Sequence, residues 1–294
     1  MAGNAPRMEP PAEEVRERRG IRKGLYLLPS AFTAANIGMG YYAVMASLRG
    51  FQLLDTDLSA AAAHFDNAAR AIGWAVLFDA LDGRIARMTK TTTEMGIQLD
   101  SIADVVTFGI APAVLAYAWG YGAALQDSSQ SQKLGWFVSF MFLMCGALRL
   151  ARFNVQATRP RTLSEGTAKM DKKNFVGLPI PAAAGLVAAI VHFAPSPLKT
   201  YAGELPALYS GLVMGLLAVL GALMVSTIRY SSFKSLGGGR RSTTKVMLFM
   251  AAVGMLIWLY SRYTLLAIVS AYVLHGLVFR LASLFRLRQP TEST

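Results

Sequence analysis

Residues 79–104 read DALDGRIARMTKTTTEMGIQLDSIAD, a stretch that carries four aspartates between two apolar segments. The apolar segments read AIGWAVLF before it and VVTFGIAPAVLAYAWG after it. The aspartates are Asp79, Asp82, Asp100 and Asp104. Carboxylates at the edge of a hydrocarbon-like segment are costly unless they are paired or bind a metal. We therefore expect two membrane helices whose polar ends meet and present these carboxylates to a common ligand.

The spacing puts each pair of aspartates on one helix face, because residues three or four apart are neighbours on a helix. A very small residue stands one turn from three of the carboxylates, which removes bulk where a ligand approaches the backbone. These small residues are Gly83, Ala86 and Gly96. The polar link MTKTTTEM is long enough to let the two helices face each other.

The same stretch matches the pattern D-x2-D-G-x2-A-R-x8-G-x3-D-x3-D at every specified position. This pattern is the signature of the CDP-alcohol phosphatidyltransferase family, which the chain resembles. The resemblance implies that the first three aspartates hold metal and nucleotide. It implies that Asp104 contacts metal and also takes the proton of the acceptor alcohol. Gly83, Ala86 and Gly96 would let the cytidine lie against the helices, and Arg87 would contact phosphate or pair with the aspartates.

Oxygen-only ligands suit hard cations such as Mg²⁺ or Mn²⁺. Four carboxylates on two facing helices have room for two such ions, which would clamp the oxygens of an in-line phosphoryl displacement. The spacings of Cys and His metal sites are absent, and Cys145 is the only cysteine. The scattered histidines His64, His192 and His275 are interpreted as structural or incidental.

The composition is that of a membrane protein, with 54% hydrophobic and 16% charged residues and a mean hydropathy of +0.40. We expect an all-α polytopic bundle of about eight transmembrane helices, six forming the family core and two following it. The net charge of +12 would favour nucleic acid in a soluble protein. Here it is explained by Lys and Arg in cytoplasmic loops, so no nucleic-acid partner is expected.

The expected spans cover about 30–48, 69–88, 97–119, 135–153, 178–194, 207–228, 245–260 and 264–283. Polar loops are expected at 49–68 and 120–134, and Pro112 is expected to kink or break the third helix. The expected divisions are a cytoplasmic tail with a juxtamembrane segment (1–28), the catalytic core (29–230), and a cytoplasmic loop with two added helices and a short tail (231–294). Residues 15–28 form either an interfacial helix on an anionic leaflet or a basic flank of the first span.

The charge distribution predicts the orientation. Among the 29 Lys and Arg, those expected outside are Arg49, Arg70, Lys133, Lys199 and Arg262. This asymmetry puts both termini, the four aspartates and the active site on the cytoplasmic side of the cell membrane. No N-terminal signal peptide is visible, so the first span would serve as the insertion signal.

Thr33, Asn36 and Gly40 form a stripe of small and polar residues on the first span. Such a stripe can simply pack helices together. Phosphatidylserine synthases carry a similar P-x3-T-x2-N-x3-G run, and this resemblance favours Thr33 and Asn36 as part of the CDP-diacylglycerol pocket.

Three further segments, SIADVVTFGIAPA, LRLARFN and F-x-GLP-x-PAAA, resemble bacterial and archaeal phosphatidylserine synthases. That branch of the family implies CDP-diacylglycerol and L-serine as substrates and a homodimer in the membrane. Arg149 and Arg152 are candidates to bind the serine carboxylate, although both also fit a positive cytoplasmic flank. The basic loop 154–176 leaves glycerol phosphate or inositol phosphate open as acceptors.

A cation transporter is the alternative from another class, since intramembrane aspartates also bind transported ions. It explains neither the Gly83, Ala86, Arg87 and Gly96 pattern nor the placement of all carboxylates on one side. A transporter site would be expected near the midplane, between repeated halves.

Overall fold

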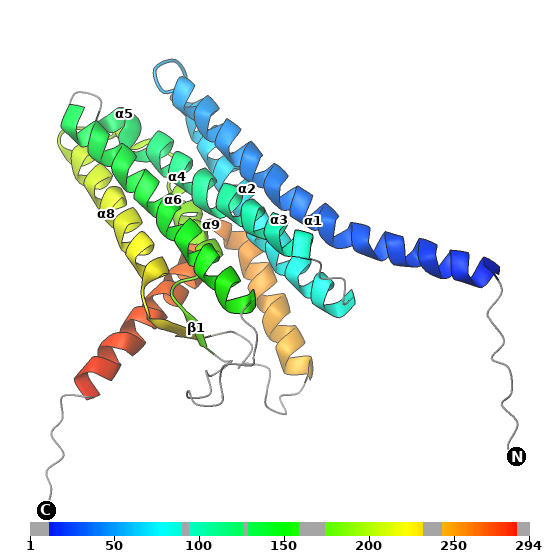
Figure 1. Ribbon diagram of the computed structural model, residues 1–294. Coiled ribbons are helices and arrows are strands. Elements are labelled where there is room, and N and C mark those ends of the chain that lie inside the picture. The colour runs from blue at the N-terminus through cyan, green and yellow to red at the C-terminus, as the bar shows by residue number, and fades with distance from the viewer. Residues whose placement is uncertain (1–11, 90–93, 126–128, 159–173, 232–242, 287–294) are drawn as a thin grey trace, which may run out of the picture.

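The computed structural model describes residues 12–89, 94–125, 129–158, 174–231 and 243–286, which form a bundle of helices (Figure 1). The elements of the first half are α1 (Ala12–Gln52), α2 (Leu58–Thr89), α3 (Glu94–Asp104), η1 (Val105–Ile110), α4 (Ala111–Ala116), η2 (Tyr117–Tyr121), α5 (Gly122–Ala124) and α6 (Ser129–Thr158). Those of the second half are β1 (Asn174–Val176), α7 (Ile180–Phe193), η4 (Leu198–Thr200), α8 (Leu205–Val225), β2 (Arg229–Ser231) and α9 (Thr243–Arg286).

The connection between α1 and α2 is much shorter than the loop predicted at 49–68, and that prediction is wrong for most of its length. Asp57 begins α2 early, because its Oδ1 accepts hydrogen bonds of 3.0 Å from the amides of Ser59 and Ala60. Hydrogen bonding, chiefly from the Ala60 amide, lowers the pKa of the Asp57 carboxyl below its usual value. A run of alanines follows, and alanine is the strongest helix former.

The third predicted helix is continuous in direction but changes its winding. Two π-helical segments, η1 and η2, flank the short α4, and Pro112 lies in the first turn of α4. In place of the predicted kink or break at Pro112, the structure shows a change of helix type. The helical residues extend to Ala124 and resume at Ser129, so the loop expected at 120–134 is also too long.

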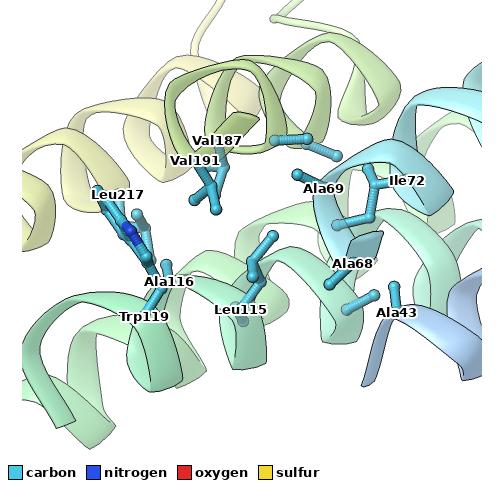
Figure 2. Close-up of a cluster of buried hydrophobic side chains, with 14 of the residues drawn as sticks. Ala43, Ala68, Ala69, Ile72, Leu115, Ala116, Trp119, Val187, Val191 and Leu217 are labelled. Carbon is cyan, nitrogen blue, oxygen red and sulfur yellow. The ribbon is translucent and has the colours of Figure 1, made fainter. Parts of the chain in front are cut away.

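Small residues let the helices of the core approach closely. Figure 2 shows Ala43 of α1, Ala68 of α2 and Leu115 of α4 in one cluster of buried side chains. All three are fully buried. Close approach of this kind drives helix association in lipid, where apolar burial alone gives little driving force.

Residues 243–286, where spans are expected near 245–260 and 264–283, form two helical halves. Within α9 the backbone leaves the helical region at Tyr260, where φ is −136° and ψ is 49°. The two halves of α9 (orange and red in Figure 1) diverge from this junction. Ser261 therefore starts a second, returning helix close to the predicted boundary.

A two-stranded ladder between β1 and β2 was not predicted. Gly177 follows β1 with φ of 83°, and its amide donates to Ile228 O at 2.8 Å. A side chain there would collide with the carbonyl of Met224. The glycine of the GLP motif is thus required by a left-handed turn and by close backbone contact.

Five helices in the described part of the chain are long and apolar enough to cross a membrane. They span Met95–Ala124, Gln130–Val155, Ile180–Thr200, Leu205–Val225 and Ala251–Gly276. The chain is therefore an integral membrane protein with a helical fold. The count of about eight spans stays a prediction.

Candidate active site

Three carboxylates converge between the last third of α2 and the second half of α3. Asp79 lies on α2, and Asp100 and Asp104 lie on α3. One carboxylate oxygen of each lies within 4.8 Å of the other two. This separation is short enough for the three side chains to bind one cation together.

Asp82, the fourth predicted ligand, is held from α1. Its side chain is 6% exposed and accepts a hydrogen bond from Thr33 Oγ1. Its charge still acts on the three other carboxylates. The structure thus brings three of the aspartates together, with Asp82 near enough to act on them electrostatically and in contact with Thr33.

The four carboxylates repel one another, and burial strengthens the repulsion because the protein interior screens charge poorly. Asp104 is 8% exposed, and within the described ranges no hydrogen-bond donor reaches its Oδ1. A buried carboxylate oxygen is costly unless a cation or a proton neutralises it. The donor set consists of carboxylate oxygens alone, so it fits a hard divalent cation such as Mg²⁺ or Mn²⁺.

Arg149 faces this cluster from α6. Its charge interacts with that of Asp104, although no ion pair within 4.0 Å joins it to an acidic residue that the structure describes. Its guanidinium lies 5.4 Å from the ring centroid of Phe153, and its buried Nε lacks an acceptor among the described residues. Arg152 is exposed. Of the two predicted serine ligands, Arg149 is therefore the one beside the cluster.

Asn36 lies one turn further along α1 than Thr33 and is 1% exposed. Its Oδ1 has no partner in the described part of the chain. Thr107 Oγ1 of η1 donates to the Asn36 carbonyl at 3.1 Å. A Cβ at Gly40 would lie 2.8 Å from Thr107 Cα. The predicted stripe therefore packs α1 tightly against η1. It also places the polar side chain of Asn36 near the helices that carry the aspartates.

The remaining predicted nucleotide ligands are less fully described. Gly83 and Gly96 are exposed on α2 and α3. The side chains of Ala86 and Arg87 lie outside the described part of the structure, as do residues 159–173 of the basic loop. Their roles stay predictions.

A contact between α6 and α3 was missed from the sequence. Asn154 Nδ2 donates to Ser101 Oγ at 2.9 Å, beside Asp100. Both residues belong to segments that resemble phosphatidylserine synthases, LRLARFN and SIADVVTFGIAPA. That shared resemblance was the available signal, but no local pattern pairs residues so far apart.

A second polar cluster lies thirteen residues back along α2, roughly 20 Å from Asp79. His192 is 4% exposed, contacts Asp66 through Nδ1, and its Nε2 lies 2.9 Å from Ser261 Oγ. Asp66 also pairs with Arg70 at 2.8 Å. The cluster joins α2, α7 and the junction within α9, which agrees with a structural role for His192.

Comparisons with known proteins point to one family. The profile of the CDP-alcohol phosphatidyltransferase family matches residues 26–224. The CDP-diacylglycerol–serine O-phosphatidyltransferase of Helicobacter pylori is 32% identical over 261 residues, covering 86% of this chain and 91% of the relative. The enzyme of that name from Methanocaldococcus jannaschii is 30% identical, over 69% of this chain and 79% of the relative. The one from Saccharomyces cerevisiae is 37% identical, over 54% and 51%.

Proposed function

Because the chain belongs to the CDP-alcohol phosphatidyltransferase family, we propose that it transfers the phosphatidyl group of CDP-diacylglycerol to L-serine. The products are phosphatidylserine and CMP. The names of relatives from a bacterium, an archaeon and a yeast support serine as the acceptor. The first of them aligns with nearly the whole chain.

The observation that carries the proposal is the buried Asp104 within a cluster of carboxylates. Asp79, Asp100 and Asp104 would hold a divalent cation, with Asp82 completing a site for a second one. Such ions, when bound, neutralise the charge of the diphosphate and of the departing CMP.

In the proposed reaction, the serine hydroxyl oxygen forms a bond to the lipid-bearing phosphorus. The bond from that phosphorus to the bridging oxygen breaks, and CMP leaves with that oxygen. The hydroxyl proton passes to the Asp104 carboxylate, whose Oδ1 has no hydrogen-bond donor within the described residues. Asp104 acts as general base once it is in reach of that proton.

The two substrates would be bound from different helices. Thr33 and Asn36 of α1, with Asp82, line the nucleotide side, and the buried Asn36 carboxamide offers a polar edge to the CDP group. Gly83, Ala86, Arg87 and Gly96 would complete that side. Arg149 binds the serine carboxylate, because it is a cation facing Asp104 without an acidic ion-pair partner in the described structure. Arg152, which is exposed, would add positive charge at the entrance.

The proposal includes eight membrane crossings, with α1, α2 and both halves of α9 among them. The active site and both termini then lie on the cytoplasmic side of the cell membrane, which agrees with the distribution of Lys and Arg. The protein would act as a homodimer.

The test is CMP release from CDP-diacylglycerol by the purified protein in detergent micelles with Mg²⁺ or Mn²⁺. We expect release that depends on serine and exceeds release with glycerol phosphate or inositol phosphate. A preference for either phosphorylated alcohol would overturn serine as acceptor and retain the family chemistry. No release with any of the three would overturn the proposal and favour a non-enzymatic cation site.

A further inference from the structure

The second half of α9 approaches Arg149 near the start of α7. A Cβ at Gly146 of α6 would contact Ile180, at the start of α7. On another side of α7, a Cβ at Gly185 would lie 3.9 Å from Val269 Cγ1 of α9. The start of α7 therefore contacts α6, and the middle of α7 contacts the second half of α9.

The directions of these helices bring two side chains to the same end of α7. His192, at the end of α7, contacts Ser261, at the start of the second half of α9, so these two helices run in opposite directions. Going along the chain from Val269 therefore leads toward the start of α7. Arg149 lies about one helical turn after Gly146, and Tyr272 lies about one helical turn after Val269. Gly146 and Val269 are the residues in contact with α7.

The contacts of Tyr272 agree with this placement. Its ring is half-buried and packs against the hydrophobic core. Its hydroxyl group and the Arg149 guanidinium are close enough to interact electrostatically. Arg149 in turn interacts with Asp104. Arg149 thus interacts with both Asp104 and Tyr272.

A guanidinium and a phenol are both hydrogen-bond donors suited to a carboxylate. Arg149 is a partly buried cation whose Nε has no acceptor within the described ranges. We infer that Arg149 and Tyr272 form one subsite for the carboxylate of the acceptor, with the Tyr272 hydroxyl donating to it. This inference rests on the proposed function and assigns acceptor recognition to α9.

The position of Tyr272 in the chain makes the inference specific. The family profile ends at residue 224, so Tyr272 lies outside the part of the chain that the whole family shares. The chemistry belongs to the shared part, where the aspartates lie. A residue from the added helices can therefore discriminate between acceptors without altering the phosphoryl-transfer residues.

The test compares Tyr272→Phe with wild type in the full-length protein, measuring kcat and the KM values for serine and for CDP-diacylglycerol. Loss of a hydrogen bond to a charged group predicts a rise in the serine KM of about tenfold or more. The KM for CDP-diacylglycerol should stay within about twofold, because the nucleotide side is untouched. Tyr260→Phe is the matched control, since Tyr260 is exposed at the junction of α9.

Two results would overturn the inference. One is an unchanged serine KM in Tyr272→Phe, and the other is a parallel loss of kcat and of both affinities, which indicates a packing role. If CMP release by the wild-type protein does not depend on serine, the proposed function itself fails. That result is obtained before any variant is made.

Discussion

Thr33 Oγ1 on α1 donates a hydrogen bond to Asp82 Oδ2 on α2. The bond fixes the one aspartate that stands outside the group of three closest carboxylates. It also connects the α1 stripe to the proposed metal and nucleotide side of the site. The face of α1 that packs against η1 is therefore also the face proposed to bind the nucleotide.

Thr33→Val should weaken this connection while keeping the shape of the side chain. Asp82 would lose a hydrogen bond to its charge, so we expect metal affinity and CDP-diacylglycerol affinity to fall together by about tenfold or more. Both are measured as concentration dependences of CMP release. Thr56→Val, at an exposed threonine in the α1–α2 connection, is the control. An unchanged metal requirement in Thr33→Val would show that the bond does not support the site.

Asp104→Asn should abolish turnover and retain substrate binding. The amide keeps the shape of the carboxylate but cannot take the acceptor proton, and loss of a general base costs about 10²- to 10⁴-fold in rate. CMP release and equilibrium binding of CDP-diacylglycerol are measured on the same preparation. Loss of CDP-diacylglycerol binding would contradict the assignment of Asp104 as base.

Removal of divalent metal should lower stability as well as activity. Without a cation, the carboxylates of Asp79, Asp100 and Asp104 repel one another in a poorly screened site. We expect a chelator to abolish CMP release and to lower the Tm of the wild-type protein, and Mg²⁺ or Mn²⁺ to restore both. Asp79→Asn should show a smaller Tm response to the chelator, because one repelling charge is gone. Equal responses in wild type and Asp79→Asn would count against a metal at this cluster.

Gly40→Ala should destabilise the protein through the contact of α1 with η1. The added methyl would lie 2.8 Å from Thr107 Cα, so the backbones must move apart at a cost of about 1–3 kcal/mol. Gly38→Ala is a matched control two residues away, because no atom lies within 4 Å of a Cβ there. It should leave stability unchanged or raise it by up to about 1 kcal/mol through helix propensity. The Tm of each variant is measured by thermal unfolding in detergent. Equal Tm values for the two variants would refute the close packing of α1 against η1.

His192→Ala should loosen the returning half of α9 and leave the chemistry in place. The substitution removes the contacts to Asp66 and Ser261, and we expect a loss of about 1–3 kcal/mol of stability. The kcat of the folded enzyme should change little, because this cluster is roughly 20 Å from Asp79. His64→Ala, at a histidine of α2 outside this cluster, is the control. A large fall in kcat with an unchanged Tm would show that the cluster takes part in the reaction.

The aspartates were predictable because their spacing on two helices is a local property of the chain. Asp79 and Asp82, or Asp100 and Asp104, share a face whatever surrounds them. The helices were predictable for the same reason, and errors came at their ends. The loop at 49–68 was overestimated because the capping by Asp57 and the alanine run were not weighed.

Contacts across the bundle were not predictable in this way. The bonds of Thr33 with Asp82 and of Asn154 with Ser101, and the contact of His192 with Asp66, join residues distant in the chain. These contacts depend on which faces of the helices pack together. The hydrophobic pattern does not predict those faces in a membrane, because lipid and protein interior are equally apolar.

Local composition and spacing were therefore enough to predict a membrane protein with acidic residues on two facing helices, and the resemblance of residues 79–104 to the family signature indicated the family. They left open that Arg149 rather than Arg152 turns toward Asp104, and that Tyr272 approaches from the last helix. Those facts depend on small residues such as Gly146 and Gly185, which bring α6, α7 and α9 into contact. Periodicity describes one helix at a time, whereas a binding site is formed by several helices, so its membership follows from their packing.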